Sequence, residues 1–234
     1  MTEAELLQSH TILTNEVENA AESLIISIDI DEFARQHPLA LFRIKEHPVF
    51  WLSIKYAQQT NFIMTLGRVM DTDPRSYSIH RLLREMIKHP EYFTRKALAS
   101  RKRGLPPGPD PEYLADYLVG VFEPDKVALK KLEAALKPIM AKYEQTFKPI
   151  RNKLYAHRDI LDSAEINALI SGGLTVDLEE ILHFLHDLLE CIFKLIYHGI
   201  EPELGHSTYS YRTRAKVAVE GALKQLLDIP ASPE

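Results

Sequence analysis

The chain has one cysteine, no long uncharged apolar run and no basic-then-apolar start, and each absence excludes a class of protein. Cys191 cannot form an internal disulfide, and its mostly apolar neighbours favour a buried thiol over a nucleophile. The longest apolar stretch, residues 178–200, is interrupted by charged and histidine side chains. Neither secretion nor a membrane span is therefore predicted, and we expect a cytoplasmic protein with no membrane partner.

The common glycine and cysteine signatures of catalysis are missing as well. The sequence contains no glycine-rich phosphate loop, no Gly-x-Ser-x-Gly turn and no zinc-type cysteine pair. These absences argue against a P-loop nucleotidase, a serine hydrolase of the common type and a zinc-ribbon protein. No cofactor and no metal are predicted.

The apolar residues recur at helical spacing almost throughout, without a convincing alternating strand, which predicts an all-α fold. Asp177 with Glu180 has the spacing of a capping box, and Pro124 suits a first helical position. A Pro/Gly-rich exposed loop is expected within residues 94–111, after a basic run. Expected helices cover residues 3–30, 47–70, 77–89, 111–120, 124–148, 163–170, 178–198 and 209–228, with a short one after residue 148.

Charge is distributed unevenly along the chain, whose net value is −5. Residues 1–34 hold eight carboxylates and no Lys or Arg, whereas residues 75–103 hold nine Lys or Arg against two Glu. A second basic stretch covers residues 142–159. The two basic segments could line one cleft that attracts a polyanion, or the run Arg95–Arg103 could merely solubilise a loop.

The most informative stretch is residues 149–159, which places Arg151 six positions before His157. An imidazole can move a proton near neutral pH, and a guanidinium can hold a phosphate through paired hydrogen bonds. RNA cleavage without a metal requires these two groups. On a helix, however, six residues separate the two side chains by about 120° and about 9 Å along the axis. Two copies facing each other across a twofold axis would bring the Arg of one chain near the His of the other.

This stretch, Arg151-Asn152-Lys153-Leu154-Tyr155-Ala156-His157-Arg158-Asp159, resembles the Arg-x(4–6)-His signature of the HEPN superfamily, in its abortive-infection AbiU-like branch. A second stretch agrees: Arg68-Val69-Met70-Asp71 followed by the Ser78 helix is similar to that branch. The resemblance implies a HEPN-type helical bundle with additional helices over residues 1–200. Residues 201–234 would then add a C-terminal helix and a frayed tail.

The resemblance also implies a homodimer that cleaves RNA through attack by the 2′-hydroxyl group, or that only binds in degenerate members. Arg151, Asn152 and His157 are the predicted catalytic residues. His157 would act as general acid or base and Arg151 would stabilise charge on the phosphate. The expected partners are RNA, a second copy and an antitoxin protein. The predicted RNA contacts are Lys148, Lys153, Tyr155 and Arg158.

Three alternatives remain open. His157 could pair with Asp159 while Arg151 pairs with a nearby carboxylate, which would leave a non-catalytic interaction module. A stripe of possible metal ligands runs along one helix, although apolar residues fill the rest of that helix. A cluster of rings and guanidiniums near the C-terminus could stack on bases or anchor the last helix. The stripe is Glu179, His183, His186 and Glu190, and the cluster is Tyr209, Tyr211, Arg212 and Arg214.

Overall fold

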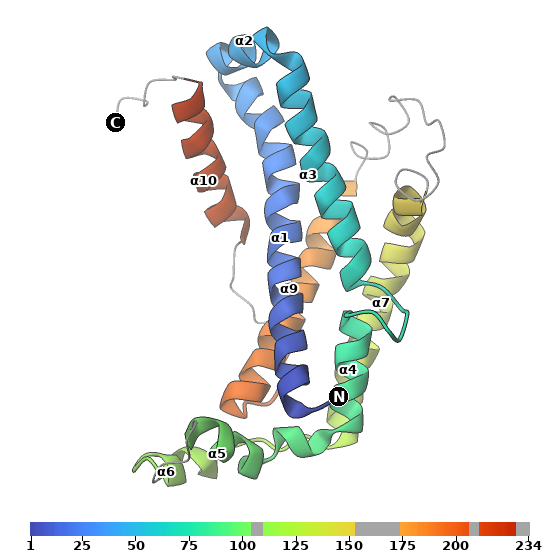
Figure 1. Cartoon of the computed structure of the whole chain (residues 1–234), viewed down its shortest axis with the longest axis vertical. Coiled ribbons are helices and arrows are strands. Elements are labelled where there is room, and N and C mark those ends of the chain that lie inside the picture. Colours follow the sequence, from blue (N-terminus) through green and yellow to red (C-terminus); the bar gives the residue numbers. More distant parts are fainter. Residues whose placement is uncertain (104–109, 153–173, 206–210, 228–234) are drawn as a thin grey trace. The chain divides into compact units, whose positions relative to one another are not determined.

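The structure, a computed structural model, describes residues 1–103, 110–152, 174–205 and 211–227. Every regular element in these ranges is a helix, which confirms the predicted all-α class for this part of the chain (Figure 1). None of the described helices combines the length and the apolar character that crossing a bilayer requires.

The chain forms two compact units. The first contains residues 1–15 and 67–207, and the second contains residues 16–66 and 208–234. The predicted domain boundary at residue 200 stays a prediction.

The first unit is built on α4 (Ile79–Lys88), α7 (Lys126–Arg151) and α9 (Leu174–His198), and α7 contacts both of the others (Figure 1). The start of α1 (Glu3–Gln36) is tied to α9, because the His10 Nε2 atom lies 2.9 Å from the Leu189 carbonyl oxygen. Shorter helices complete the unit: η1 (Pro90–Phe93), α5 (Arg95–Arg103) and α6 (Leu114–Val119).

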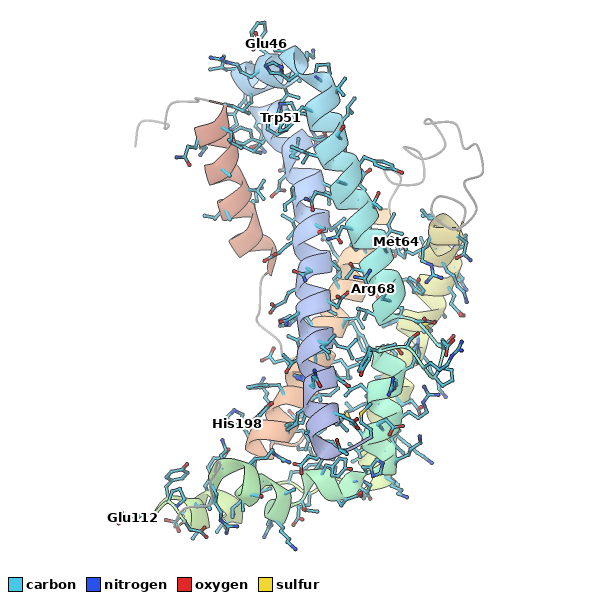
Figure 2. The ribbon with its side chains drawn as sticks, in the orientation of Figure 1. Glu46, Trp51, Met64, Arg68, Glu112 and His198 are labelled. Atoms are coloured by element: carbon cyan, nitrogen blue, oxygen red, sulfur yellow. The ribbon has the colours of Figure 1, made fainter. Side chains whose placement is uncertain are left out.

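The second unit consists of the rest of α1, α2 (Pro38–Glu46), most of α3 (Pro48–Val69) and α10 (Tyr211–Leu226). Trp51, labelled in Figure 2, belongs to its apolar core. An ion pair between Lys55 and Asp31 and a 2.8 Å hydrogen bond from Asn61 to Ser23 connect α3 to α1. The buried core residues are Ile30, Phe33, Ala40, Trp51, Leu223 and Leu227.

Helix α7 positions the predicted site, and it is longer than expected. It starts after Asp125, whose carboxylate accepts a 2.7 Å hydrogen bond from the Ala128 amide, so Pro124 precedes the cap instead of opening the helix. It then continues through Pro149, although residue 148 was its predicted end. Interior proline costs about 3 kcal/mol, but Phe147 and Ile150 on either side are buried. Burying each is worth roughly 1.5–3 kcal/mol, which offsets that cost.

The predicted capping box at the start of α9 is wrong. The helix begins at Leu174, so Asp177 lies inside its first turn instead of capping it. Asp177 and Glu180 both form ion pairs with Lys142 of α7, the first at 3.1 Å. A carboxylate in the first turn also interacts favourably with the positive end of the helix dipole.

The interpretation of the run Arg95–Arg103 as a solubilising loop is also wrong, because these residues form α5. Within α5, the side chains of Leu98 and Ala99 are buried. The Arg101 guanidinium donates hydrogen bonds of 2.8 Å to the carbonyl oxygens of Tyr92 and Ile196 and pairs with Glu3. Part of the basic run therefore holds the fold together. Residues 104–109 of the expected loop lie outside the described residues.

Helix α2 was not predicted, and its surface explains why. Of its residues only Ala40 is buried, whereas Leu39, Leu41 and Phe42 are exposed. Apolar residues that do not gather on one buried face give no clear helical period. Together α2 and the start of α3 expose an apolar surface that consists of Leu39, Leu41, Phe42, Val49, Phe50, Leu52 and Tyr56, which we call the α2–α3 apolar surface.

Candidate functional site

Arg151, the last residue of α7, is half-buried and reaches the C-terminal end of α3. Its Nη1 atom donates a 3.3 Å hydrogen bond to the Gly67 carbonyl oxygen. Gly67 lies within the last four residues of α3, whose carbonyl groups have no partner inside the helix. The guanidinium therefore supplies a donor to an otherwise unsatisfied acceptor at the negative end of the helix dipole. Figure 2 labels the next residue, Arg68, at this end of α3.

Gly67 leaves room for the Arg151 side chain. A Cβ atom at residue 67 would lie 2.6 Å from Cδ and 2.9 Å from Nη1 of Arg151, closer than such atoms approach in real proteins. Glycine inside a helix costs about 1 kcal/mol relative to alanine. The glycine therefore leaves room for this placement of the arginine, whose flexible far end would have to shift to admit a Cβ atom.

Asp71, just after α3, adds a negative charge beside Arg151. Its Oδ2 atom accepts a 2.6 Å hydrogen bond from the Ser76 hydroxyl, and its Oδ1 atom accepts a 3.0 Å bond from the Asp73 amide. The pKa of Asp71 is lowered chiefly by the Ser76 and Asp73 hydrogen bonds, and the positive charge of Arg151 lowers it further. Asp71 is thus an ionised carboxylate held in place by its own loop.

Tyr143 forms the buried side of the site. Its side chain is 3% exposed, and its hydroxyl group lies close to the Arg151 guanidinium but makes no well-formed hydrogen bond within the described residues. Burial raises the pKa of Tyr143, and the nearby Arg151 guanidinium opposes this rise. The hydroxyl therefore stays protonated at neutral pH and can donate a hydrogen bond.

His80 lies on α4, facing α7. Its Nε2 atom is 3.4 Å from the Met140 sulfur, and burial, helped by the charge of Arg84, lowers the pKa of His80. Below neutral pH this ring resists protonation. The helix that the resemblance begins at Ser78 is α4, and Ser78 caps it, since its hydroxyl accepts a 3.4 Å hydrogen bond from the Arg81 amide.

Three of the seven predicted site residues are described. Arg151 lies in the arrangement above, Asn152 caps the C-terminal end of α7, and Lys148 pairs with Glu144 at 3.1 Å. Asn152 is half-buried, and its backbone amide bonds to the carbonyl oxygens of Lys148 and Pro149. The other four predicted residues, Lys153, Tyr155, His157 and Arg158, lie outside the described residues. The same holds for the side chains of Tyr209, Tyr211, Arg212 and Arg214.

Sequence reasoning did not assign Gly67 or Tyr143 to the site. Gly67 is the only glycine within residues 48–69, and an isolated glycine in a strongly helical segment indicates a packing requirement. Tyr143 has no comparable signal, because a tyrosine on an apolar helix face is ordinary core. Asp71 was noticed only through the family resemblance.

The structure also bears on two of the other sites considered from the sequence, the possible metal stripe on α9 and Cys191. Among the residues that the structure describes, no group of three or more His, Cys, Asp or Glu could hold a metal ion, and the stripe on α9 is therefore not such a group. Cys191 is buried, as expected, and its sulfur donates to the Glu203 carbonyl oxygen at 2.9 Å. Burial, together with the charge of Asp187, raises the pKa of Cys191 to about 11, so this thiol is a poor nucleophile.

Comparison with known proteins agrees with the motif and the fold. The HEPN family model described as AbiU2 matches residues 10–213 and so includes Gly67, Asp71, Arg151 and His157. Neither the curated proteins nor the solved structures give a significant match. Because the matched segment extends over most of the 234 residues, the chain belongs to the AbiU2 family of HEPN proteins.

Proposed function

We propose that this protein is a dimeric, metal-independent endoribonuclease of the abortive-infection type. The observation that carries the proposal is the fixed position of Arg151, which bonds to Gly67 while the ionised Asp71 lies nearby. An arginine that only completed a helix end would not require a histidine six positions later. Here His157 follows Arg151 at that spacing and completes the HEPN signature. The position of Arg151 and the family membership support the same chemistry.

In the proposed reaction the ribose 2′-hydroxyl oxygen attacks the adjacent phosphorus and the bond from phosphorus to the 5′-oxygen breaks. His157 either takes the proton from the 2′-hydroxyl or donates one to the leaving 5′-oxygen, and water supplies or accepts the other proton. Arg151 holds the non-bridging oxygens, where negative charge increases in the transition state. The products are a 2′,3′-cyclic phosphate and a free 5′-hydroxyl group. Asn152, Lys148, Lys153, Tyr155 and Arg158 are the proposed RNA contacts around this centre.

The proposed site is composite, with Arg151 of one chain facing His157 of a second copy. We expect twice the monomer mass by light scattering at micromolar concentration. Mixing inactive Arg151→Ala with inactive His157→Ala should restore activity, because half of the randomly formed dimers carry one intact site. The recovered activity should approach about one quarter of the wild-type value. A monomeric protein, or no recovery after exchange of subunits is verified, contradicts a composite site.

The proposed chemistry also predicts indifference to divalent ions. Cleavage of a mixed RNA substrate should continue at its full rate in excess EDTA, because the charge on phosphate is balanced by Arg151. His183→Ala on the exposed side of α9 should leave that rate unchanged in the same buffer. Loss of activity in EDTA and its return with zinc or manganese would move the assignment to a metal site.

A second candidate function is a non-catalytic interaction module, and the α2–α3 apolar surface favours it. Val49 is 76% exposed, and six further large apolar side chains on the two helices are exposed as well. Large exposed apolar patches mark contact sites for other macromolecules. In the proposed toxin an antitoxin protein is one such partner. End-group analysis of RNA treated with the purified protein separates the two functions, since only the nuclease leaves cyclic phosphate ends.

A further inference from the structure

The geometry points to Gly67 and Asp71 as positioning residues for Arg151: the glycine provides the space and the carbonyl group that hold the guanidinium, and the carboxylate supplies an opposite charge nearby. The claim that these residues assist catalysis by positioning Arg151 rests on the proposed function. The contacts themselves belong to the described part of the first unit and do not depend on any activity.

The first step is steric. The Cδ, Nη1 and Nε atoms of Arg151 lie 2.6, 2.9 and 3.5 Å from the place of a Cβ atom on residue 67. The far end of the Arg151 side chain therefore occupies the space that a Cβ atom at residue 67 would fill. Glycine is the least favourable helix former after proline, so α3 loses stability by having it there. Gly67 weakens α3 but admits the Arg151 side chain from α7. It thereby helps to determine where that side chain lies.

The second step is electrostatic. The Gly67 carbonyl group holds one edge of the guanidinium, and the Asp71 carboxylate supplies the nearby opposite charge. Ser76 and Asp73 hold both carboxylate oxygens through hydrogen bonds, so the negative charge is fixed before any substrate arrives. A planar guanidinium has five N–H donors, so it can contact a carbonyl oxygen on one side and a phosphate on another. Preorganised donors of this kind stabilise a transition state without reorganising during the reaction.

The third step concerns the separation in sequence between the residues that form the site. Gly67 and Arg151 are 84 residues apart in sequence, and their contact joins the end of α3 to the end of α7. Tyr143, eight residues before Arg151 on α7, closes the buried side with a hydroxyl group that makes no well-formed hydrogen bond within the described residues. Small displacements of an arginine at such a site should lower turnover more than they lower substrate affinity.

The test compares Gly67→Ala in two backgrounds. In an Arg151→Ala protein the new methyl group meets no arginine, so helix propensity should raise the melting temperature by about 2–4 °C. In the wild-type background the methyl group displaces Arg151, and the gain should vanish or reverse. Gly221→Ala is the matched control: Gly221 lies inside α10 with nothing within 4 Å of its Cβ position, so its gain should be equal in both backgrounds.

Kinetics then separate positioning from structure. Gly67→Ala should lower kcat about as strongly as Arg151→Ala while KM changes less than threefold, and Asp71→Asn should lower kcat by about tenfold. An equal thermal gain from Gly67→Ala in both backgrounds would overturn the contact. The expected thermal pattern with wild-type kcat in Gly67→Ala would overturn the positioning role. If the thermal pattern holds and no RNA is cleaved by any variant, the contact stands, and both the positioning role and the proposed function fail.

Discussion

Replacing His157 by alanine should slow RNA cleavage by about 10²–10⁴-fold, which is the usual contribution of a positioned acid or base. The reaction cannot proceed at the full rate without a group that moves a proton near neutral pH, and the proposed mechanism assigns that role to His157. Initial rates on a broad RNA panel, with identification of the product ends, measure the effect.

Two controls make this loss interpretable. The melting temperature of His157→Ala should agree with that of the wild type within a few degrees, so that the loss reflects chemistry. His47→Ala, which removes an exposed histidine at the end of α2, should retain full activity. Equal cleavage by wild type and His157→Ala would refute the catalytic assignment and favour the interaction module.

Arg151→Lys should reduce kcat by roughly 10²–10³-fold, as the loss of one preorganised donor does in other enzymes. Lysine keeps the positive charge but lacks the planar fork that can contact the Gly67 carbonyl oxygen and a phosphate together. RNA affinity, measured by fluorescence anisotropy at fixed salt, should change by only about threefold because the charge is retained.

The matched control for this change is Arg35→Lys. Arg35 is exposed in the last turn of α1 and donates to the Asp31 carbonyl oxygen at 3.3 Å, so lysine should substitute there without loss of rate. If Arg151→Lys binds and cleaves RNA as well as the wild type, bidentate contact is unnecessary. The conclusion would then be that Arg151 only completes the end of α3.

Local signals predicted most of the helices but not their ends. The helix expected at residues 77–89 is α4, and Ser78, with which the second HEPN-like stretch begins this helix, is its cap. The continuation of α7 past Pro149 depends on burial of Ile150, which only the packed structure reveals. The same holds for α5, whose basic residues suggested a solvated loop until Arg101 was found bonded to carbonyl groups of η1 and α9. In each case tertiary packing overrode the local pattern.

The sequence motif also indicated only part of the candidate site. Arg151 and His157 stand six positions apart in one recognisable stretch, and the family match confirms that resemblance. Gly67 contributes through a contact with a residue 84 positions away, which no local pattern encodes. Asp71 carried a signal only as part of the second HEPN-like stretch. The family motif was therefore readable from the sequence, whereas the groups that contact Arg151 were not.

The exclusion of a Cβ atom at Gly67 has an evolutionary consequence. As long as natural selection preserves this placement of Arg151, glycine should be favoured at residue 67, because a larger residue would shift the end of the arginine side chain. A lineage that loses the arginine is released from that constraint, and alanine then becomes the favoured replacement because it strengthens α3. The two positions should therefore change together among relatives. Alanine at the position of Gly67 would therefore mark the family members in which the arginine is placed differently or has been lost.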